Sequence, residues 1–274
     1  MTAVIDPIVS SDWLHSNHHV TTVCDVRPGG PSDPWLGYLD GHLPAAILID
    51  LDAVLADPPA PVLGRHPLPD PIRFAKALGA LGIGNEATVV AYDDMGGAYA
   101  SRFVWMLRII GQSAALLDGG RRAWTGVLER GQVEVDPVDR EPVPWPTEAL
   151  ADSTAVQRHI AEGGSVIDSR APERFRGETE PQDDVAGHIP GAANVPFADN
   201  LDGSGRFLDT AALAARFAPF DDAAPIVYCG SGVTACHNAL AMEAAGFGLP
   251  RVYVGSWSGW STEPGRIVAV GDES

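Results

Sequence analysis

The sequence is poor in cysteine and in basic side chains. Its 274 residues include only three cysteines, Cys24, Cys229 and Cys236. A count this low and odd excludes a disulfide framework and is typical of a reducing compartment, so we expect a cytoplasmic protein. Lysine and arginine together number 18 against 36 acidic residues, a formal net charge of −18. Because phosphate binding needs clustered cations, this balance argues against nucleic acid or anionic membrane as the main partner, while small anionic ligands remain open.

Long apolar runs are missing as well. The longest, such as residues 45–49, are far shorter than the ~20 residues that a membrane span requires. Residues 1–16 have no basic stretch followed by an apolar core, so we expect no secretory signal. The 45% of hydrophobic residues is ample for a packed core, and the length favours two domains of roughly 130 residues each. We therefore expect a soluble, globular, two-domain protein with no membrane partner.

The chain contains an internal repeat. A short apolar strand ending in Asp-x-Arg occurs at Asp25 and again at Asp168. Each is followed by a Gly-His-x-Pro turn, with His42 in the first copy and His188 in the second. Repeated features in the same order indicate duplicated architecture.

The downstream matches show where the two copies differ. A second apolar strand is followed by Asp93 in the first copy and by Cys229 in the second. In each copy a tryptophan, Trp124 or Trp260, stands 31 positions later. Four matches in one order indicate a tandem duplication, in which the two copies have diverged at Asp93 and Cys229.

The repeat and the punctuation of the chain predict the domain organisation. Buried strands of four to six residues alternate with helical segments, such as 99–110 and 234–245. Such alternation predicts an α/β protein whose two domains each contain a mainly parallel sheet with helices on both faces. We place the first domain at residues 1–136 and the second at 151–274. Residues 137–150 form the linker, because a proline-rich stretch there prevents a helix or a central strand.

The loop that begins at Cys229 is the strongest chemical signal. The residues Cys-Gly-Ser-Gly-Val-Thr-Ala, 229–235, follow an apolar strand and open a helix. Gly230 and Gly232 allow the backbone to curl until successive N–H groups point inward, which makes an anion-binding nest at a helix N-terminus. This setting favours a thiolate on Cys229, at the carboxyl end of its strand, and nucleophilic attack by its sulfur.

Competing chemistries fail at specific positions. A phosphatase loop of the Cys-x5-Arg type needs arginine where this chain has Ala235. Ser231 lacks the flanking glycines of a nucleophilic serine elbow. Cys229, Cys236 and His237 have no second pair of ligands at a zinc spacing, so no metal is expected. Cys24 and Cys236 are interpreted as buried structural cysteines, with a resolving or redox-sensing role as the alternative for Cys236.

The duplicated pattern resembles the two-domain rhodaneses, a family of sulfurtransferases, over about residues 5–268. The resemblance implies two tandem rhodanese-like domains, of which the first is catalytically silent because Asp93 takes the cysteine position. It implies that Cys229 accepts a sulfane sulfur from a small anionic donor, forms a persulfide, and passes the sulfur to a thiol or cyanide, with thioredoxin among the candidate acceptors. The covalent persulfide then serves in place of any cofactor. Its charge is held by the backbone of Gly230, Ser231, Gly232, Val233, Thr234 and Ala235.

The same resemblance bears on the sulfur donor. The loop is similar to that of 3-mercaptopyruvate sulfurtransferases, whereas thiosulfate sulfurtransferases carry cations directly after the cysteine. Ser231 is then the candidate proton relay. Of the two arginines that the mercaptopyruvate enzymes use for the donor, Arg174 matches the first; the second is absent from residues 179–183, and Arg176 is the candidate replacement. An N-domain histidine lies near the cysteine loop in these enzymes, and His42 is the candidate for it.

The sequence thus predicts a sulfurtransferase that uses 3-mercaptopyruvate through a Cys229 persulfide. Thiosulfate as the donor, by the same mechanism, remains the main alternative. A second alternative is a sulfur carrier that receives sulfur from a partner protein. A non-catalytic scaffold is disfavoured, because it gives no function to the glycine-rich loop around Cys229.

Overall fold

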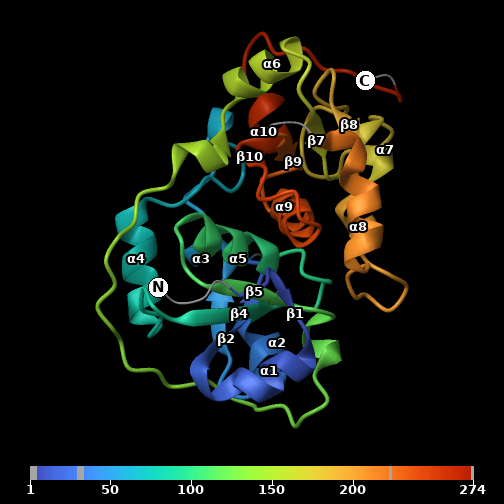
Figure 1. The fold of residues 1–274 in the computed structure, drawn as a ribbon. Coiled ribbons are helices and arrows are strands. Elements are labelled where there is room, and N and C mark those ends of the chain that lie inside the picture. The colour runs from blue at the N-terminus through green and yellow to red at the C-terminus, as the bar shows by residue number, and fades with distance from the viewer. Residues whose placement is uncertain (1–4, 30–33, 222–223, 273–274) are drawn as a thin grey trace. The chain divides into compact units, whose positions relative to one another are not determined.

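The computed structural model describes residues 5–29, 34–221 and 224–272, and they cluster into two compact units (Figure 1). Unit 1 consists of residues 1–57, 68–146 and 204–206, and unit 2 of residues 58–67, 147–203 and 207–274. Each unit therefore includes a short segment from the other half of the chain: residues 58–67 belong to unit 2, and residues 204–206 belong to unit 1. The proline-rich stretch belongs to unit 1, where the N–H of Val138 donates to the carbonyl of Gly79 at 2.9 Å.

Unit 1 is built on a five-stranded sheet whose strand pairs are all parallel. Its order is β1-β5-β4-β2-β3, and β4 pairs with β2 in a register that places Val90 opposite Val23. Both valines are buried. Apolar strands of this kind are expected in a parallel sheet that is covered on both faces. The strands are β1 (Ile8–Val9), β2 (Thr21–Arg27), β3 (Ile47–Asp50), β4 (Thr88–Tyr92) and β5 (Ala114–Leu117).

Unit 2 repeats this sheet strand for strand. Its order, β6-β10-β9-β7-β8, is again parallel throughout and matches that of unit 1 position by position. The position of β4 in unit 1 is held by β9 in unit 2, which is followed directly by Cys229. The strands are β6 (Leu150–Ala151), β7 (Val166–Asp168), β8 (Ala193–Asn194), β9 (Ile226–Tyr228) and β10 (Arg251–Tyr253).

Several helices start where an aspartate supplies an N-cap. The carboxylates of Asp70, Asp152 and Asp209 each accept a hydrogen bond from a backbone N–H of the first turn, which satisfies donors that a helix start leaves unpaired. The helices of unit 1 are α1 (Ser11–Asn17), α2 (Pro34–Asp40), α3 (Leu51–Val54), α4 (Pro71–Ala80) and α5 (Ala100–Ile109). Those of unit 2 are α6 (Ser153–Ala161), α7 (Pro172–Phe175), α8 (Thr210–Phe217), α9 (Ala235–Ala244) and α10 (Ser256–Trp260).

These elements confirm the predicted fold class. The expected helices at 99–110 and 234–245 are α5 and α9, each one residue shorter at both ends. Two parallel sheets of identical order, each flanked by helices, are what a tandem duplication predicts. Among the described residues, none of the helices is both long and apolar enough to span a bilayer.

Residues 58–67 were not predicted to leave the first domain. This segment contains the short 3-10 helix η2 (Pro61–Leu63), which lies beside α10 in Figure 1. A hydrogen bond helps to hold it there: the N–H of Arg65 donates to the side-chain Oγ of Ser258 at 3.0 Å. Gly64 has φ +81°, and a Cβ on it would lie 2.4 Å from the carbonyl oxygen of Gly255. Only glycine fits this close backbone approach.

Candidate active site

Cys229 is held rigidly at the carboxyl end of β9. Its side chain is buried, at 2% exposure. Its N–H donates to Oγ of Ser256 at 3.1 Å, and its carbonyl accepts the N–H of Trp257 at 2.9 Å. Ser256 itself adopts φ +53°, an uncommon conformation for a residue with a side chain. The turn that opens α10 therefore fixes the position from which the Cys229 sulfur acts.

The glycines of the loop are required by close contacts. Gly232 has φ +75°, and a Cβ on it would lie 2.5 Å from the carbonyl oxygen of Val254. A Cβ on Gly230 would lie 3.0 Å from Nη2 of Arg65 and 3.3 Å from Nη2 of Arg174. Gly232 lets the loop curl. Gly230, which directly follows the cysteine, leaves room for two guanidinium groups.

Arg174 reaches the loop from α7 and is oriented by a buried acid. Its guanidinium donates to both carboxylate oxygens of Glu180, at 2.6 and 3.2 Å. Glu180 also accepts from Arg170 at 3.2 Å. Burial raises the pKa of Glu180, but the hydrogen bond from Arg174 and the positive charge of Arg170 outweigh it, so this pKa lies below its ordinary value. The ionised carboxylate of Glu180 therefore holds the guanidinium of Arg174 in place.

Arg170 anchors this network to the sheet. It donates to the buried Asp168 at the end of β7, at 2.6 Å, and to the carbonyl of Gly187 at 2.7 Å. Its guanidinium carbon lies 4.8 Å from the centre of a Trp257 ring, a cation–π contact. Burial acts to lower the pKa of Arg170, but the carboxylate of Asp168 has the larger effect and raises this pKa above its ordinary value. The Asp-x-Arg repeat is thus a structural pair in this copy.

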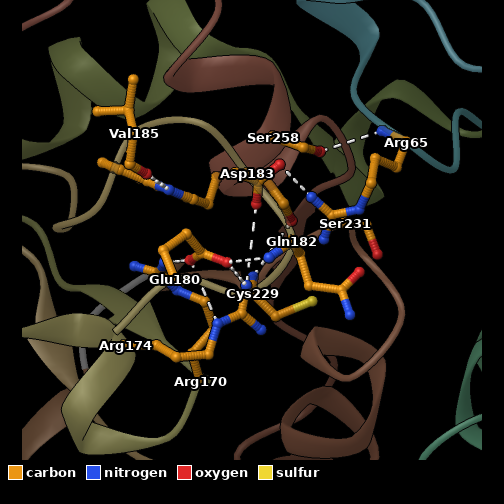
Figure 2. Close-up of polar contacts among 12 residues, drawn as sticks. Arg65, Arg170, Arg174, Glu180, Gln182, Asp183, Val185, Cys229, Ser231 and Ser258 are labelled. Carbon is orange, nitrogen blue, oxygen red and sulfur yellow. Dashed lines mark hydrogen bonds and ion pairs between the residues drawn. The ribbon is translucent and has the colours of Figure 1, made fainter. Parts of the chain in front are cut away.

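Arg65 approaches the same loop from segment 58–67. It forms an ion pair with Asp183, and Oδ2 of Asp183 lies 3.8 Å from Nη2 of Arg174. Figure 2 shows Asp183 between the two arginines, with Cys229 beside them. The Asp183 carboxylate is 8% exposed. Its Oδ2 is buried and has no hydrogen-bond partner.

Ser231 is paired with a histidine that the sequence analysis did not single out. Oγ of Ser231 lies 2.8 Å from Nδ1 of His66, in the same segment as Arg65. Ser231 is itself buried, at 8% exposure. A hydroxyl bonded to an imidazole next to a nucleophile can move a proton to or from a reacting group. The sequence analysis missed Arg65 and His66. The local signal for them was the Gly-Arg-His-Pro sequence, 64–67, inside an otherwise apolar, proline-rich stretch.

Two sequence-based assignments are corrected by these contacts. Arg176 was the candidate for the second donor-binding arginine, but its guanidinium pairs with the exposed Glu178 at 2.8 Å, and the arginine that lies with Arg174 beside Gly230 is Arg65. The histidine that reaches Ser231 is His66 rather than His42. The resemblance implied a histidine from the first half of the chain near the loop, and that residue is His66, not His42.

His42 has a structural role in unit 1 that His188 repeats in unit 2. His42 belongs to unit 1, where its Nδ1 lies 2.8 Å from the carbonyl oxygen of Leu43 and its ring stacks on Tyr38. Its counterpart His188 does the same in unit 2, with the Phe175 carbonyl at 2.8 Å from Nδ1 and its ring stacked on Phe175. Both histidines therefore hold the backbone of equivalent turns.

The counterpart of the Cys229 loop in unit 1 already contains an anion. The carboxylate of Asp93 accepts four backbone N–H groups, from Met95, Gly97, Tyr99 and Ala100, at 2.8 to 2.9 Å. Burial raises the pKa of Asp93, and these four donors oppose the rise. In this copy the loop's N–H groups converge on the residue that occupies the cysteine position.

Cys24 and Cys236 lie in the interior, away from the chemistry expected of Cys229. All three cysteines are free and buried. Cys24 lies in β2, where burial strongly raises the pKa of its thiol, and Cys236 donates its S–H to the carbonyl of Gly232 at 3.3 Å. Within residues 5–29, 34–221 and 224–272, no group of three or more His, Cys, Asp or Glu side chains is arranged to hold a metal ion.

Comparison with known families identifies the architecture. The model of the rhodanese-like domain matches the chain twice, over residues 10–126 and 152–263. The chain belongs to the rhodanese family. The predicted resemblance is thereby confirmed, and the two matched segments correspond to the two copies of the repeat.

The relatives of this rhodanese are named for sulfur transfer. A Pseudomonas aeruginosa protein provisionally named 3-mercaptopyruvate sulfurtransferase is 45% identical over 254 residues, which covers 88% of this chain and 89% of that protein. A Mycobacterium tuberculosis protein provisionally named thiosulfate sulfurtransferase SseB is 38% identical over 247 residues and 87% of each chain. The crystal structure of SseA from Escherichia coli, a 3-mercaptopyruvate sulfotransferase, matches with a TM-score of 0.80 and 32% identity over 92% of this chain and 99% of that one.

Proposed function

We propose that this rhodanese transfers sulfane sulfur from 3-mercaptopyruvate to a thiol or cyanide through a persulfide on Cys229. The observation that carries the proposal is the guanidinium of Arg174, which lies beside Gly230 in the neutral loop that follows Cys229. A guanidinium group beside a loop whose own residues are neutral suits a carboxylate donor. The names of the relatives support sulfur transfer but divide between the two donors.

The first half of the reaction follows from the groups around Cys229. The Cys229 thiolate attacks the sulfur of 3-mercaptopyruvate, and a new S–S bond forms while the donor's C–S bond breaks. The electron pair of that bond goes to the former C3 of the donor, which becomes pyruvate after it takes a proton. The donor's own thiol loses the proton that balances this step. The hydroxyl of Ser231, bonded to His66, is placed to relay it.

The second half returns the enzyme to its starting state. An acceptor thiolate or cyanide attacks the outer sulfur of the persulfide, the S–S bond breaks, and its electron pair restores the Cys229 thiolate. Between the two halves the persulfide is an anion at the N-terminal end of α9. We assign its stabilisation to the backbone of residues 230–235. The four N–H groups that converge on Asp93 in the equivalent loop of unit 1 support this assignment.

Several narrower assignments belong to the same proposal. No cofactor is required, since the persulfide carries the sulfur between donor and acceptor. The first copy is silent because a carboxylate stands where the thiol would be. Thioredoxin is a candidate acceptor, and the three free thiols fit a cytoplasmic location.

Steady-state assays with 3-mercaptopyruvate and thiosulfate side by side test the proposal, with Cys229→Ser as the blank. A preference for 3-mercaptopyruvate of about tenfold or more, or ~1.4 kcal/mol in the barrier, is expected and must vanish in the blank. A preference for thiosulfate contradicts the donor assignment but keeps the persulfide mechanism. Folded protein that turns over neither donor points instead to a carrier loaded by a partner protein.

A further inference from the structure

Residues 58–63 form an apolar surface at the start of the segment that reaches the active site. Their sequence is Pro-Pro-Ala-Pro-Val-Leu, and every side chain in it is exposed except that of Ala60, which is half-buried. We call this segment the apolar run. Globular proteins seldom leave consecutive apolar side chains in contact with water unless a partner covers them.

The apolar run is fixed to unit 2 through its backbone. The carbonyl oxygen of Pro61 accepts a hydrogen bond from Oγ1 of Thr262, and the carbonyl oxygen of Val62 lies 2.8 Å from the position of a Cβ on Gly259. The side chains of Val62 and Leu63 are 49% and 56% exposed, so they add little to this attachment. Because prolines also restrict the backbone, the run is a rigid surface that loses little conformational entropy when a partner docks.

The apolar run leads directly to the reacting residue. A cavity of about 430 Å³ in unit 2 is lined by Pro59, Ala60 and Pro61, and also by Arg65, which reaches the loop beside Cys229. Among the described residues of unit 2, the exposed large hydrophobic side chains are those of Val62, Leu63, Val185, Ile267 and Val270. The first two lie in the run and the third lines the cavity, so exposed apolar surface is gathered around its mouth.

Charge narrows the choice of occupant for this surface. The carboxylates of Asp183 and Asp184 line the same cavity, and the whole chain has a formal charge of −18. An anionic lipid surface and a second copy of the chain would both be repelled. Cyanide or a small thiol is too small to cover the run. The occupant that fits is a protein segment with apolar residues for the run and a cation for the exposed Asp184.

We infer that the apolar run is the docking surface for a protein that brings the acceptor thiol, and that apolar residues and a cation flank the acceptor cysteine. The inference rests on the proposed function, because it assigns the acceptor of the second half-reaction. Cys229 is only 2% exposed, so docked residues have to carry the acceptor thiolate to it. That thiolate forms a new S–S bond with the outer persulfide sulfur, and the electron pair of the old S–S bond returns to Cys229.

The test measures kcat/KM for two cysteine peptides as sulfur acceptors, with an excess of whichever donor the wild type turns over. Both peptides carry one lysine, and they differ only in having leucine or serine on either side of the cysteine. The wild type is expected to favour the leucine peptide about tenfold or more, because the docked leucines leave water. In Val62→Ser/Leu63→Ser this preference is expected to fall to about threefold or less, while kcat/KM for cyanide stays within about twofold.

Matched variants separate the apolar contact from the charge. Ile267→Ser/Val270→Ser removes two exposed apolar side chains of unit 2 that do not line the cavity, so the preference for the leucine peptide should remain. Asp184→Asn should lower kcat/KM for both peptides by a similar factor, about threefold, because both carry the lysine.

Four results would overturn the inference. They are equal use of the two peptides by the wild type, an unchanged leucine preference in Val62→Ser/Leu63→Ser, a parallel loss for cyanide, and a wild-type dimer that the double variant dissociates in sedimentation equilibrium. A parallel loss for cyanide would show that the run only positions Arg65 and His66. A dissociating dimer would assign the surface to a second copy of the chain. A folded wild type that transfers sulfur neither to cyanide nor to the peptides overturns the proposed function itself.

Discussion

Nδ1 of His66 lies 2.8 Å from Oγ of Ser231, although the two residues are 165 positions apart in the chain. Because segment 58–67 is part of unit 2, this contact forms within one compact unit. It brings an imidazole to a hydroxyl two residues from Cys229. The same segment delivers Arg65 to the site, so ten residues of the first half of the chain supply two side chains to the chemistry of the second.

The Ser231–His66 pair predicts a donor-selective loss of activity. Release of pyruvate from 3-mercaptopyruvate requires a proton on carbon, whereas sulfite leaves thiosulfate with its electron pair and needs none. Ser231→Ala and His66→Gln are therefore expected to lower kcat for 3-mercaptopyruvate about 10²-fold, and kcat for thiosulfate by less than about threefold. Parallel assays of both donors measure this ratio. Equal losses on both donors would show that the pair only shapes the loop.

His42 provides the comparison for this prediction. It is the counterpart of His188, and its ring holds a backbone carbonyl in unit 1. His42→Gln is expected to lower the unfolding midpoint in urea, because a buried hydrogen bond and a stacked ring are lost. Turnover per folded molecule should stay within about threefold. A donor-dependent loss of the kind expected for His66 would restore His42 to the proton relay.

Much of the fold could be predicted because the duplication records it twice. The strands are short, mainly apolar and alternate with helices, so the pattern predicts parallel sheets without knowledge of distant contacts. The nucleophile could be predicted because the residues around Cys229 form one continuous strand–loop–helix segment.

The missed residues depend on contacts that no local pattern encodes. Segment 58–67 has neither strand nor helix periodicity, and its placement in unit 2 rests on close approaches such as Gly64 to the carbonyl of Gly255. Arg65 and His66 consequently had no visible partner in the sequence. His42 was a candidate only through the resemblance, and its contacts with the Leu43 carbonyl and the Tyr38 ring are structural.

The Gly232 contact predicts a loss larger than conformational strain alone. Gly232→Ala forces a Cβ to 2.5 Å from the Val254 carbonyl, at φ +75°. Gly246→Ala is the matched control, because Gly246 has φ +92° with no atom within 4 Å of the added Cβ. Both variants bear ~1–2 kcal/mol of left-handed strain, and Gly232→Ala a further ~1–3 kcal/mol of overpacking. Urea unfolding of both variants measures the difference; equal losses would mean that the loop yields without cost.

Glu180 predicts a specific dependence of stability on pH. Its pKa is lower in the folded protein than in the unfolded chain, so ionised Glu180 stabilises the fold at pH values above its ordinary pKa of 4.5. This contribution is lost as the pH falls through the folded-state value. Glu180→Gln is therefore expected to be less stable than the wild type at pH 7, with the gap closing below about pH 4.5. Thermal melts between pH 3 and 7, on the order of one per half unit, measure the gap.

Glu178→Gln is the control for that experiment. The hydrogen bond from Arg176 also lowers the pKa of Glu178, but Glu178 is exposed, so solvent screens the pair and little stability depends on it. Its melting temperature should follow that of the wild type at every pH. If the Glu180→Gln gap instead stayed constant down to pH 3, the loss would come from packing and not from the charge of the carboxylate.

Asp93 predicts that stability and activity can be separated in the first copy. Its two carboxylate oxygens each accept two backbone N–H groups. Asp93→Asn retains one oxygen and leaves one pair of donors without an acceptor, and Asp93→Ala leaves both pairs. Since each unsatisfied buried donor costs ~1–3 kcal/mol, the unfolding midpoint in urea should fall in the order wild type, Asn, Ala. Turnover of 3-mercaptopyruvate per folded molecule should stay within about twofold, because the chemistry belongs to Cys229. A variant that stays folded but loses turnover would show that the first copy takes part in sulfur transfer, and the silence assigned to it would be wrong.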